Sequence, residues 1–534
     1  MNYLLQISVG PVQDFISAAR RTRDLWFGSN MLSEISKAAA KSVSQNGGSL
    51  IFPAPENDDD LLPGSDLSVA NIILAEFEDS DGEKLKAVSD FALEAAKSRL
   101  KIYAQKVYEK MKNYIVKDRW DSQLDDVIEF YSAWTPIDDG DYHSARKNVA
   151  RLLAARKNIR DFKPNPFPDR VPKSSLDGLR ESVLIRNESD EALSDLPKGV
   201  RIKPNESLDA IGLIKRVPTS KNDWVFPSVS SVALGILTRE DENDFDDICG
   251  ELEAPYIAFI CADGDKMGAA LSKLDSAESH RKFSRSLSRF ALKARDVITM
   301  NQGICVYTGG DDVMAFVPVG DSLDCARGLY DLFKNTMRDY PDVSLSVGIA
   351  IAHAMENLAY LFSFGREAES IAKKGVRNKA VTDGNDRNGL AISVRSRGNI
   401  PFVVREQWKP LNDSEVLADM SIEQRIKFFA ECFVNIKIPA KFPYELRENA
   451  KFYDSWTNAS TISEAIRSDV IRIFSRKDIT LDAGESKAVR EYIISKVKDA
   501  ETMREFADEL ILSQWISSGM TKGGDNIEVQ NQTS

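Results

Sequence analysis

The chain has 534 residues, enough for about two to four domains, and 43% of them are apolar, a normal value for a globular protein. Acidic residues outnumber basic ones by 82 to 70. The net charge of −12 excludes a general polyanion binder, so contact with nucleic acid needs a local basic surface or partner subunits. No apolar run reaches the length of a membrane span, and Met1 to Ser8 form a strand pattern without signal-peptide features, so we expect a cytoplasmic protein.

Cysteine and histidine are too sparse to indicate a metal or nuclease motif. The five cysteines show no CxxC spacing, so the sequence predicts neither a zinc ribbon nor a disulfide framework. The three histidines are far apart, and none precedes an aspartate, so no His-Asp phosphohydrolase motif is visible. We therefore expect the histidines to be structural or surface residues.

The first 81 residues repeat an order of elements that returns later in the chain. Strands are expected at residues 3–9, 48–53 and 69–77, with a long helix after the first. The aspartate motifs of the later copy are absent here: the first strand runs into Val9-Gly10-Pro11, and the position of the later hairpin is taken by Pro53-Ala54-Pro55-Glu56-Asn57. We predict a degenerate ferredoxin-like module without a metal site, the alternative being coincidental alternation of helix and strand.

Residues 82–250 are expected to be mainly helical. A helical pattern covers 82–162, prolines at 164–172 mark a boundary, and an acidic linker at 240–244 precedes the next module. Basic side chains gather at the end of the helical pattern, where they form either a solvated helix face or a surface toward RNA or a partner: Arg146, Lys147, Arg151, Arg156, Lys157, Arg160 and Lys163.

Residues 251–400 carry the most informative motifs. The apolar strand 256–262 runs into Asp263-Gly264-Asp265-Lys266, and a long helix is expected over about 269–299. Gly309-Gly310-Asp311-Asp312 lies between the apolar runs 304–307 and 313–317. Two glycines permit a tight turn and close backbone approach, so this stretch predicts a hairpin with carboxylates at its tip.

If these strands are neighbours, their carboxylates converge as a palm-type nucleotidyl transferase requires to hold divalent metals against a triphosphate. We predict Asp263, Asp311 and Asp312 as catalytic, metal-binding residues for two Mg²⁺ or Mn²⁺ ions. The predicted nucleotide-binding residues, with ATP as substrate, are Gly264, Asp265, Lys266, Gly309, Gly310 and Lys374. The alternative for each motif is ordinary turn chemistry that closes a strand.

The remaining patterns complete an α+β chain. A helix, a strand, a helix ending at Lys373-Lys374 and a further strand follow the hairpin and complete a second ferredoxin-like module. Amphipathic patterns predict a C-terminal helical bundle over 401–520, and 521–534 is expected to be a disordered tail.

Four segments carry a resemblance to a known family. They are residues 10–26 followed by Gly28-Ser29, and residues 173–183, 211–216 and 226–228. Together with the Asp263 and Asp312 motifs, they closely resemble the large, polymerase- and cyclase-like subunit of type III-B (Cmr) CRISPR effector complexes. The chain starts at its first palm-like module, so we expect no N-terminal His-Asp nuclease domain. It has Ser174-Ser175 where many members carry cysteines, so no zinc is expected.

The resemblance implies a crRNA-guided complex, with the other Cmr subunits, crRNA and target RNA as partners. Target RNA would activate ATP-dependent formation of cyclic oligoadenylates in antiviral defence. Two alternatives stay open: transfer of AMP from ATP to another small acceptor such as S-adenosylmethionine, and a non-catalytic scaffold. A diguanylate-cyclase-like enzyme is disfavoured because its usual Gly-Gly-Asp-Glu-Phe signature is not met.

Overall fold

The computed structural model describes most of the chain. Described are residues 1–159, 171–185, 196–219, 229–233, 256–374, 386–397, 400–411, 414, 416–456, 460–477 and 479–530. The proline-marked boundary at 164–170, the linker 240–244 and the motif 226–228 lie outside these residues. No helix among the described residues is both long and apolar enough to cross a bilayer.

The N-terminal sheet has four antiparallel strands in the order β2-β3-β1-β4. Buried alternating side chains of β1 and β3 explain why these segments form its centre. Helices α2 and α3 pack on one face, and α5 covers the other. The bounds are β1 Tyr3–Gly10, α1 Gln13–Ser17, α2 Thr22–Gln45, β2 Ser49–Phe52, β3 Ile72–Phe77, α3 Gly82–Met111, α4 Lys117–Asp125, β4 Glu129–Pro136 and α5 Tyr142–Asn158.

Strand β4 corrects two expectations. The helical prediction for 82–162 is wrong at Glu129–Pro136, which pairs with β1 along its whole length. The first module therefore extends beyond residue 81, through β4 to α5. The sequence did not indicate this strand, because it lies at the sheet edge. Only Ala133 of β4 is buried, so buried and exposed side chains do not alternate along it.

The second sheet has six strands in the order β10-β9-β8-β5-β7-β6. Its core, β8-β5-β7-β6, is antiparallel and repeats the strand order of the first sheet, and β9 adds in parallel to β8. The bounds are β5 Tyr256–Asp265, α9 Met267–Ser272, α10 Ala277–Met300, β6 Ile304–Gly309, β7 Asp312–Pro318, α11 Ser322–Thr336, β8 Ser344–His353, α12 Leu358–Lys374, β9 Gly389–Arg395 and β10 Phe402–Gln407.

Two boundaries in this module differ from expectation. The single helix predicted over 269–299 is two helices, because the hydroxyl of Ser276 accepts from the Ser279 amide and starts α10 anew. The sheet continues through β10 into residues 401–520, for which a C-terminal helical bundle is predicted, since Phe402–Gln407 pairs with β9.

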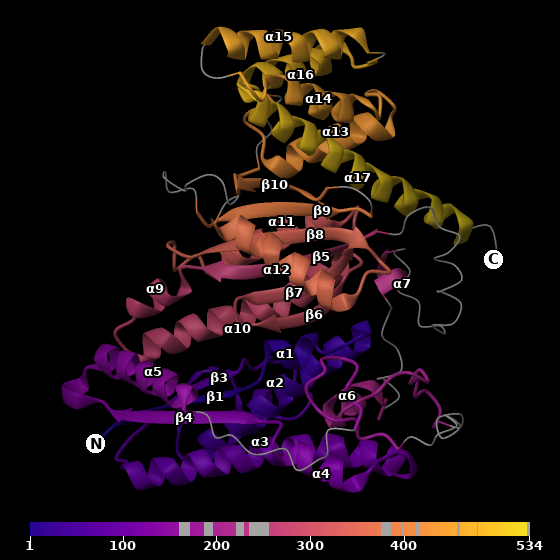
Figure 1. Cartoon of the computed structure of the whole chain (residues 1–534). Coiled ribbons are helices and arrows are strands. Elements are labelled where there is room, and N and C mark those ends of the chain that lie inside the picture. Colours follow the sequence, from indigo (N-terminus) through magenta and orange to yellow (C-terminus); the bar gives the residue numbers. More distant parts are fainter. Residues whose placement is uncertain are drawn as a thin grey trace.

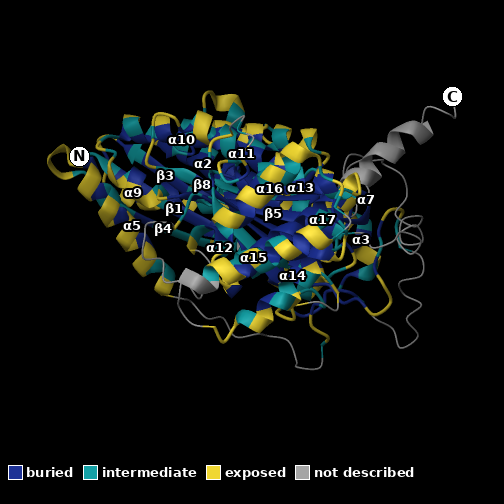
Figure 2. Ribbon diagram, turned by 90° about the horizontal axis from the view of Figure 1, so that it is seen from above, coloured by how far each residue is buried: buried dark blue, intermediate teal, exposed yellow. Residues whose placement is uncertain are grey.

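The two sheets are stacked parts of one molecule rather than separate bodies (Figure 1). One apolar core joins residues of α2 and α3 to Phe259 of β5, Phe316 of β7 and Phe362 of α12. Helices α10 and α11 form a second core on the opposite face of the second sheet. Figure 2 shows the buried strands beneath helices whose outer faces are exposed.

The C-terminal helices form a bundle that packs on the second sheet through α13 and α17 (Figure 1). Buried Arg425 of α13 bonds Glu406 of β10 and, at 2.9 Å, Glu509 of α17. Helix α17 continues to Gln530, into the segment for which a disordered tail is predicted. The bounds are α13 Ile422–Val434, α14 Phe442–Ala450, α15 Ser460–Arg476, α16 Ala483–Lys496 and α17 Ala500–Gln530.

A buried contact between modules makes stability sensitive to pH. The Tyr142 hydroxyl of α5 lies 2.8 Å from His280 Nδ1 of α10. Burial lowers the pKa of His280 to about 4, and Arg146 and Arg281 act in the same direction. The unfolded chain binds this proton near the ordinary pKa of about 6.5. Stability from neutral His280 is therefore complete above that pH and is lost as the pH falls toward 4.

As the pH falls from the unfolded to the folded pKa of His280, we expect its protonation to lower the free energy of unfolding by about 3 kcal/mol. Urea unfolding at a series of pH values measures it, as the difference between wild type and H280N. The matched control is H143N, which changes an exposed histidine of α5. Equal pH slopes for wild type and H280N would contradict the assignment.

Candidate active site

The pairing of β5 with β7 brings the predicted carboxylates to one end of the sheet. The last registered pair of these strands is Ala262 with Val313, so the next step places Asp263 opposite Asp312. Residues opposite each other on antiparallel strands have Cβ atoms about 5 Å apart. Asp263 and Asp312 thus face each other across the two strands, and Asp311 lies beside Asp312 in the hairpin turn.

Two glycines, Gly264 and Gly310, allow the backbone and the Asp311 carboxylate to lie close together. Gly309 pairs with Asp312, so Gly310 and Asp311 form the two-residue loop, and Gly310 has φ +67° at its first position. A Cβ on Gly264 would lie 2.6 Å from Asp311 Oδ2 and 2.8 Å from its Cβ. The Gly264 backbone also donates to the Asp311 carboxylate. Gly264 and Gly310 therefore set the position of Asp311.

The hairpin carboxylates are poorly solvated. Burial raises the pKa of Asp311 to about 6. Burial, with the neighbouring charges of Asp311 and Glu369, raises the pKa of Asp312 to about 7. Burial likewise raises the pKa of Glu369, which lies on α12. A site that crowds buried carboxylates in this way favours binding of a cation.

Of the two lysines that end α12, Lys373 makes the contacts with the carboxylates of this site. The Lys373 ammonium pairs with Asp263 and lies 2.9 Å from Glu369 Oε1, whereas Lys374 is exposed. Burial, with Arg387 and Lys374 nearby, lowers the pKa of Lys373 to about 8. Lys266 is also exposed, at the left-handed start of α9.

Asp265 does not reach the surface that Asp263 shares with the hairpin. Its side chain is fully buried, and Oδ2 accepts from Ser344 Oγ, Ser346 Oγ and the Asn388 amide, each at 2.8 Å. Its role in binding nucleotide stays a prediction.

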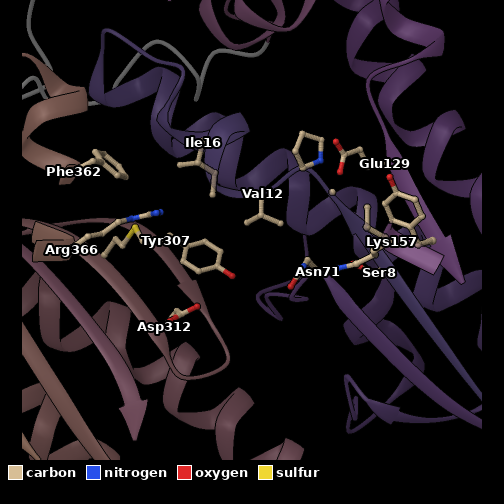
Figure 3. A pocket seen from close by; sticks show the side chains of 15 residues that line it. Ser8, Val12, Ile16, Asn71, Glu129, Lys157, Tyr307, Asp312, Phe362 and Arg366 are labelled. Atoms are coloured by element: carbon tan, nitrogen blue, oxygen red, sulfur yellow. The ribbon is translucent and has the colours of Figure 1, made fainter. Parts of the chain in front are cut away.

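A cavity of about 410 Å³ lies between the modules, and Asp312 is part of its wall (Figure 3). Tyr307, Met314, Phe362 and Arg366 line it from the second module. The first module supplies Ser8, Val9, Gly10, Pro11, Val12, Ile16, Asn71, Glu129, Tyr131 and Lys157. This volume lies within the usual range for small-molecule sites.

Sequence reasoning missed the contributions of α12 and of the first module. Arg366, Glu369 and Lys373 recur at helical spacing on one face of α12, and that spacing was a signal available in the sequence. Lys157, which belongs to the predicted basic segment, lines the cavity. Arg156 of the same segment stacks on Tyr131, 5.7 Å from the ring centre.

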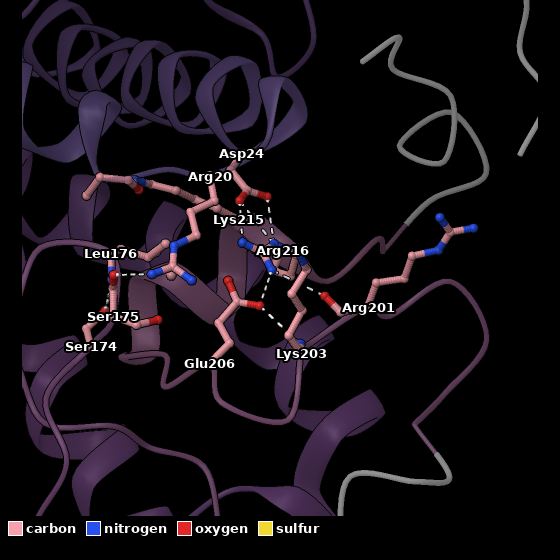
Figure 4. A network of polar contacts seen from close by, with 12 residues as sticks. Arg20, Asp24, Ser174, Ser175, Leu176, Arg201, Lys203, Glu206, Lys215 and Arg216 are labelled. Carbon is pink, nitrogen blue, oxygen red and sulfur yellow. Dashed lines mark hydrogen bonds and ion pairs between the residues drawn. The ribbon is translucent and has the colours of Figure 1, made fainter. Parts of the chain in front are cut away.

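A buried polar network holds the cavity wall of the first module (Figure 4). The buried Arg216 guanidinium of α6 (Ala210–Arg216) bonds Asp24 of α2 at 2.7 Å and Glu206 at 2.9 Å. Lys215 donates to the carbonyls of Phe15 and Ala18, which end α1, and Arg20 donates to the Ser175 carbonyl at 3.0 Å. Residues 10–26, 173–183 and 211–216, which resemble the Cmr family in sequence, thus meet at one place.

The residues present fit a divalent cation in their donor chemistry. Among the described residues, no three acidic, histidine or cysteine side chains stand ready as a metal cage. Asp263, Asp311 and Asp312 nevertheless offer hard carboxylate oxygens, which Mg²⁺ and Mn²⁺ prefer. Asp263 already binds one cation, the Lys373 ammonium.

Comparisons with known proteins identify related families. The family described as Cas10/Cmr2, second palm domain, matches residues 256–381, and the one described as CRISPR-associated protein Cmr2, N-terminal, matches residues 4–124. The Cmr2 subunit of the CRISPR Cmr system of Pyrococcus furiosus is 24% identical over 273 residues, which is 46% of this chain and 28% of that protein. The match thus spans less than a third of this relative.

Solved structures share the fold. The type III-B Cmr-beta structure bound to cognate target RNA has a TM-score of 0.62 at 13% identity, covering 97% of this chain and 83% of that one. The Csm1–Csm4 cassette in complex with pppApA has a TM-score of 0.51 at 12% identity, covering 96% and 69%.

The two sheets, their order of elements and the position of the hairpin define a mixed α+β protein with a Cas10-type palm domain. The chain therefore carries both an N-terminal match and a palm match to Cas10/Cmr2 proteins.

The contact of Gly264 with Asp311 predicts a steric defect. We expect G264A to lower the free energy of unfolding by about 1–3 kcal/mol, because its methyl group must displace Asp311. Thermal unfolding measures the change. The control is G268A, since a Cβ on Gly268 of α9 has nothing within 4 Å, and alanine in a helix should leave stability unchanged or slightly higher. Equal melting temperatures for wild type and G264A would contradict the close packing.

Proposed function

We propose that this chain is the large subunit of a crRNA-guided type III-B complex and that target RNA activates it to join ATP into cyclic oligoadenylates. The observation that carries this proposal is the register of β5 and β7, which puts Asp263 opposite Asp312, with Asp312 in the wall of the inter-module cavity. Paired carboxylates next to a nucleotide-sized cavity suit metal-assisted nucleotidyl transfer. The fold likeness to a Cmr-beta structure bound to target RNA supports the proposed partners: other Cmr subunits, crRNA and target RNA.

Each residue has a distinct task in this proposal. Asp263 and Asp312 would hold two Mg²⁺ or Mn²⁺ ions, with Asp311 assisting. When bound, such ions lower the pKa of an attacking ribose 3′-hydroxyl and stabilise the leaving pyrophosphate. Gly310, where a Cβ would have nothing within 4 Å, allows the backbone to approach the nucleotide closely. Lys373 would move its ammonium from Asp263 to the triphosphate, and Tyr307 and Phe362 restrict water at the cavity wall.

The decisive experiment incubates the reconstituted complex with ATP, Mn²⁺ and matching target RNA, and identifies the products by mass spectrometry. We expect cyclic oligoadenylates from the wild type and at least about a hundredfold less product from D311A/D312A, because the metal-holding carboxylates are gone. A parallel reaction contains S-adenosylmethionine. An AMP conjugate of this acceptor would replace the proposed product, and silence in every reaction with RNA binding intact would leave a scaffold.

Substitutions of two neighbouring lysines test the assignment of Lys373 as the lysine that contacts the triphosphate. K373M removes the ammonium that contacts Asp263 and Glu369, and we expect product formation to fall roughly tenfold to a hundredfold. K374M changes an exposed neighbour on the same helix and should stay within about twofold of wild type. Initial rates of both variants in the activated complex measure the difference. A larger loss in K374M than in K373M would refute the assignment.

A further inference from the structure

The structure assigns Asp265 as a positioning residue that holds the C-terminal end of α12, and with it Lys373, against Asp263. This inference rests on the proposed function for its catalytic consequence. Its structural content stands on contacts alone.

Asp265 makes the contacts of an anchor. Ser344 and Ser346 of β8 donate their hydroxyls to Oδ2, and the Asn388 amide donates to the same oxygen, each at 2.8 Å. The side chain is 0% exposed. Arg387 Nη1 lies 3.9 Å from Oδ1. A carboxylate held by neutral donors on a central strand cannot move toward a ligand without leaving those donors unsatisfied.

The segment that Asp265 holds is strained. Arg387 and Asn388 both have left-handed backbone conformations, with φ +70° and +47°. Consecutive non-glycine residues adopt this region only when surrounding contacts impose it. The Trp408 amide donates to the Asn388 carbonyl at 2.8 Å, and Gln407 donates to the Arg387 carbonyl at 3.3 Å. Asp265 supplies the contact to the catalytic strand.

The contacts form a path that begins at Asp265 and returns to the same strand, β5, at Asp263. Asp265 binds the Asn388 amide, and the adjacent Arg387 amide donates to the Lys373 carbonyl at 2.6 Å. The Lys373 side chain returns to Asp263, two residues before Asp265. Arg405 of β10 holds the same helix end through the Ala372 carbonyl at 3.1 Å. Loss of the Asp265 contact therefore loosens the backbone that places the Lys373 ammonium.

Hydrogen exchange on the full chain tests the anchor without any turnover. We expect faster exchange of the Arg387 and Asn388 amides in D265N than in wild type. D263N changes the other carboxylate of the same strand and should leave this segment unaffected. S344A/S346A loosens Asp265 without removing its charge and should act in the same direction, which keeps the test valid if D265N folds poorly. Unchanged exchange in both D265N and S344A/S346A would overturn the inference.

Binding of Mn²⁺ with ATP, followed by electron paramagnetic resonance, separates positioning from ligation. We expect D265N to keep the affinity within about threefold while turnover in the activated complex falls roughly tenfold or more, as for a misplaced group. D263N should lose affinity itself. Equal losses of affinity in D265N and D263N would make Asp265 a ligand and overturn the inference. If the complex makes no product at all, the exchange and binding results still decide the role of Asp265.

Discussion

The antiparallel pairing of β5 with β7 is the constraint on which the site depends. Slipping its register by one residue would turn the buried side chains of both strands to the wrong faces, and Phe259 and Phe316 lie in the common core. The positions of Asp263 and Asp312 are therefore fixed by apolar packing, not by their own charges, which repel each other. The raised pKa values of Asp311 and Asp312 show the cost that the core imposes on the site.

The first module contributes to the same site without carboxylates of its own. Its strand order matches that of the second module, but β1 ends in Val9 and Gly10, followed by Pro11. These residues and α1 form a wall of the cavity. This wall can contribute to the site only if its distance from Asp312 stays constant. The buried contacts of Lys215 with α1 and of Arg216 with α2 hold these helices in place. Removing one partner of a buried ion pair is strongly destabilising, so these contacts help to hold the wall in place.

The sequence predicted the strands and the hairpin because long apolar runs end there in glycine and aspartate, a local signal. It failed where tertiary contacts decide. Strand β4 is half-buried along one edge, so its burial pattern carries no period. Lys373 and Lys374 are adjacent on α12, and packing of α12 on the second sheet decides that Lys373 contacts Asp263. The alternation of side chains along β5 groups Asp265 with Asp263, yet the serines of β8 bury Asp265.

The two aspartates of β5 have different roles: Asp265 supports the surrounding backbone, and Asp263 can exchange the cation that it binds. Asp265 is held by two hydroxyls and an amide, neutral donors whose places are set by β8 and by the backbone at Asn388. Asp263 is held by the ammonium of a flexible side chain and keeps 31% of its own side chain exposed. A lysine that loses this partner can find another anion, whereas buried hydroxyls and amides cannot be left unpaired without a cost in free energy. Asp263 can therefore exchange its cation for another, and Asp265 can keep the surrounding backbone in place while that exchange occurs.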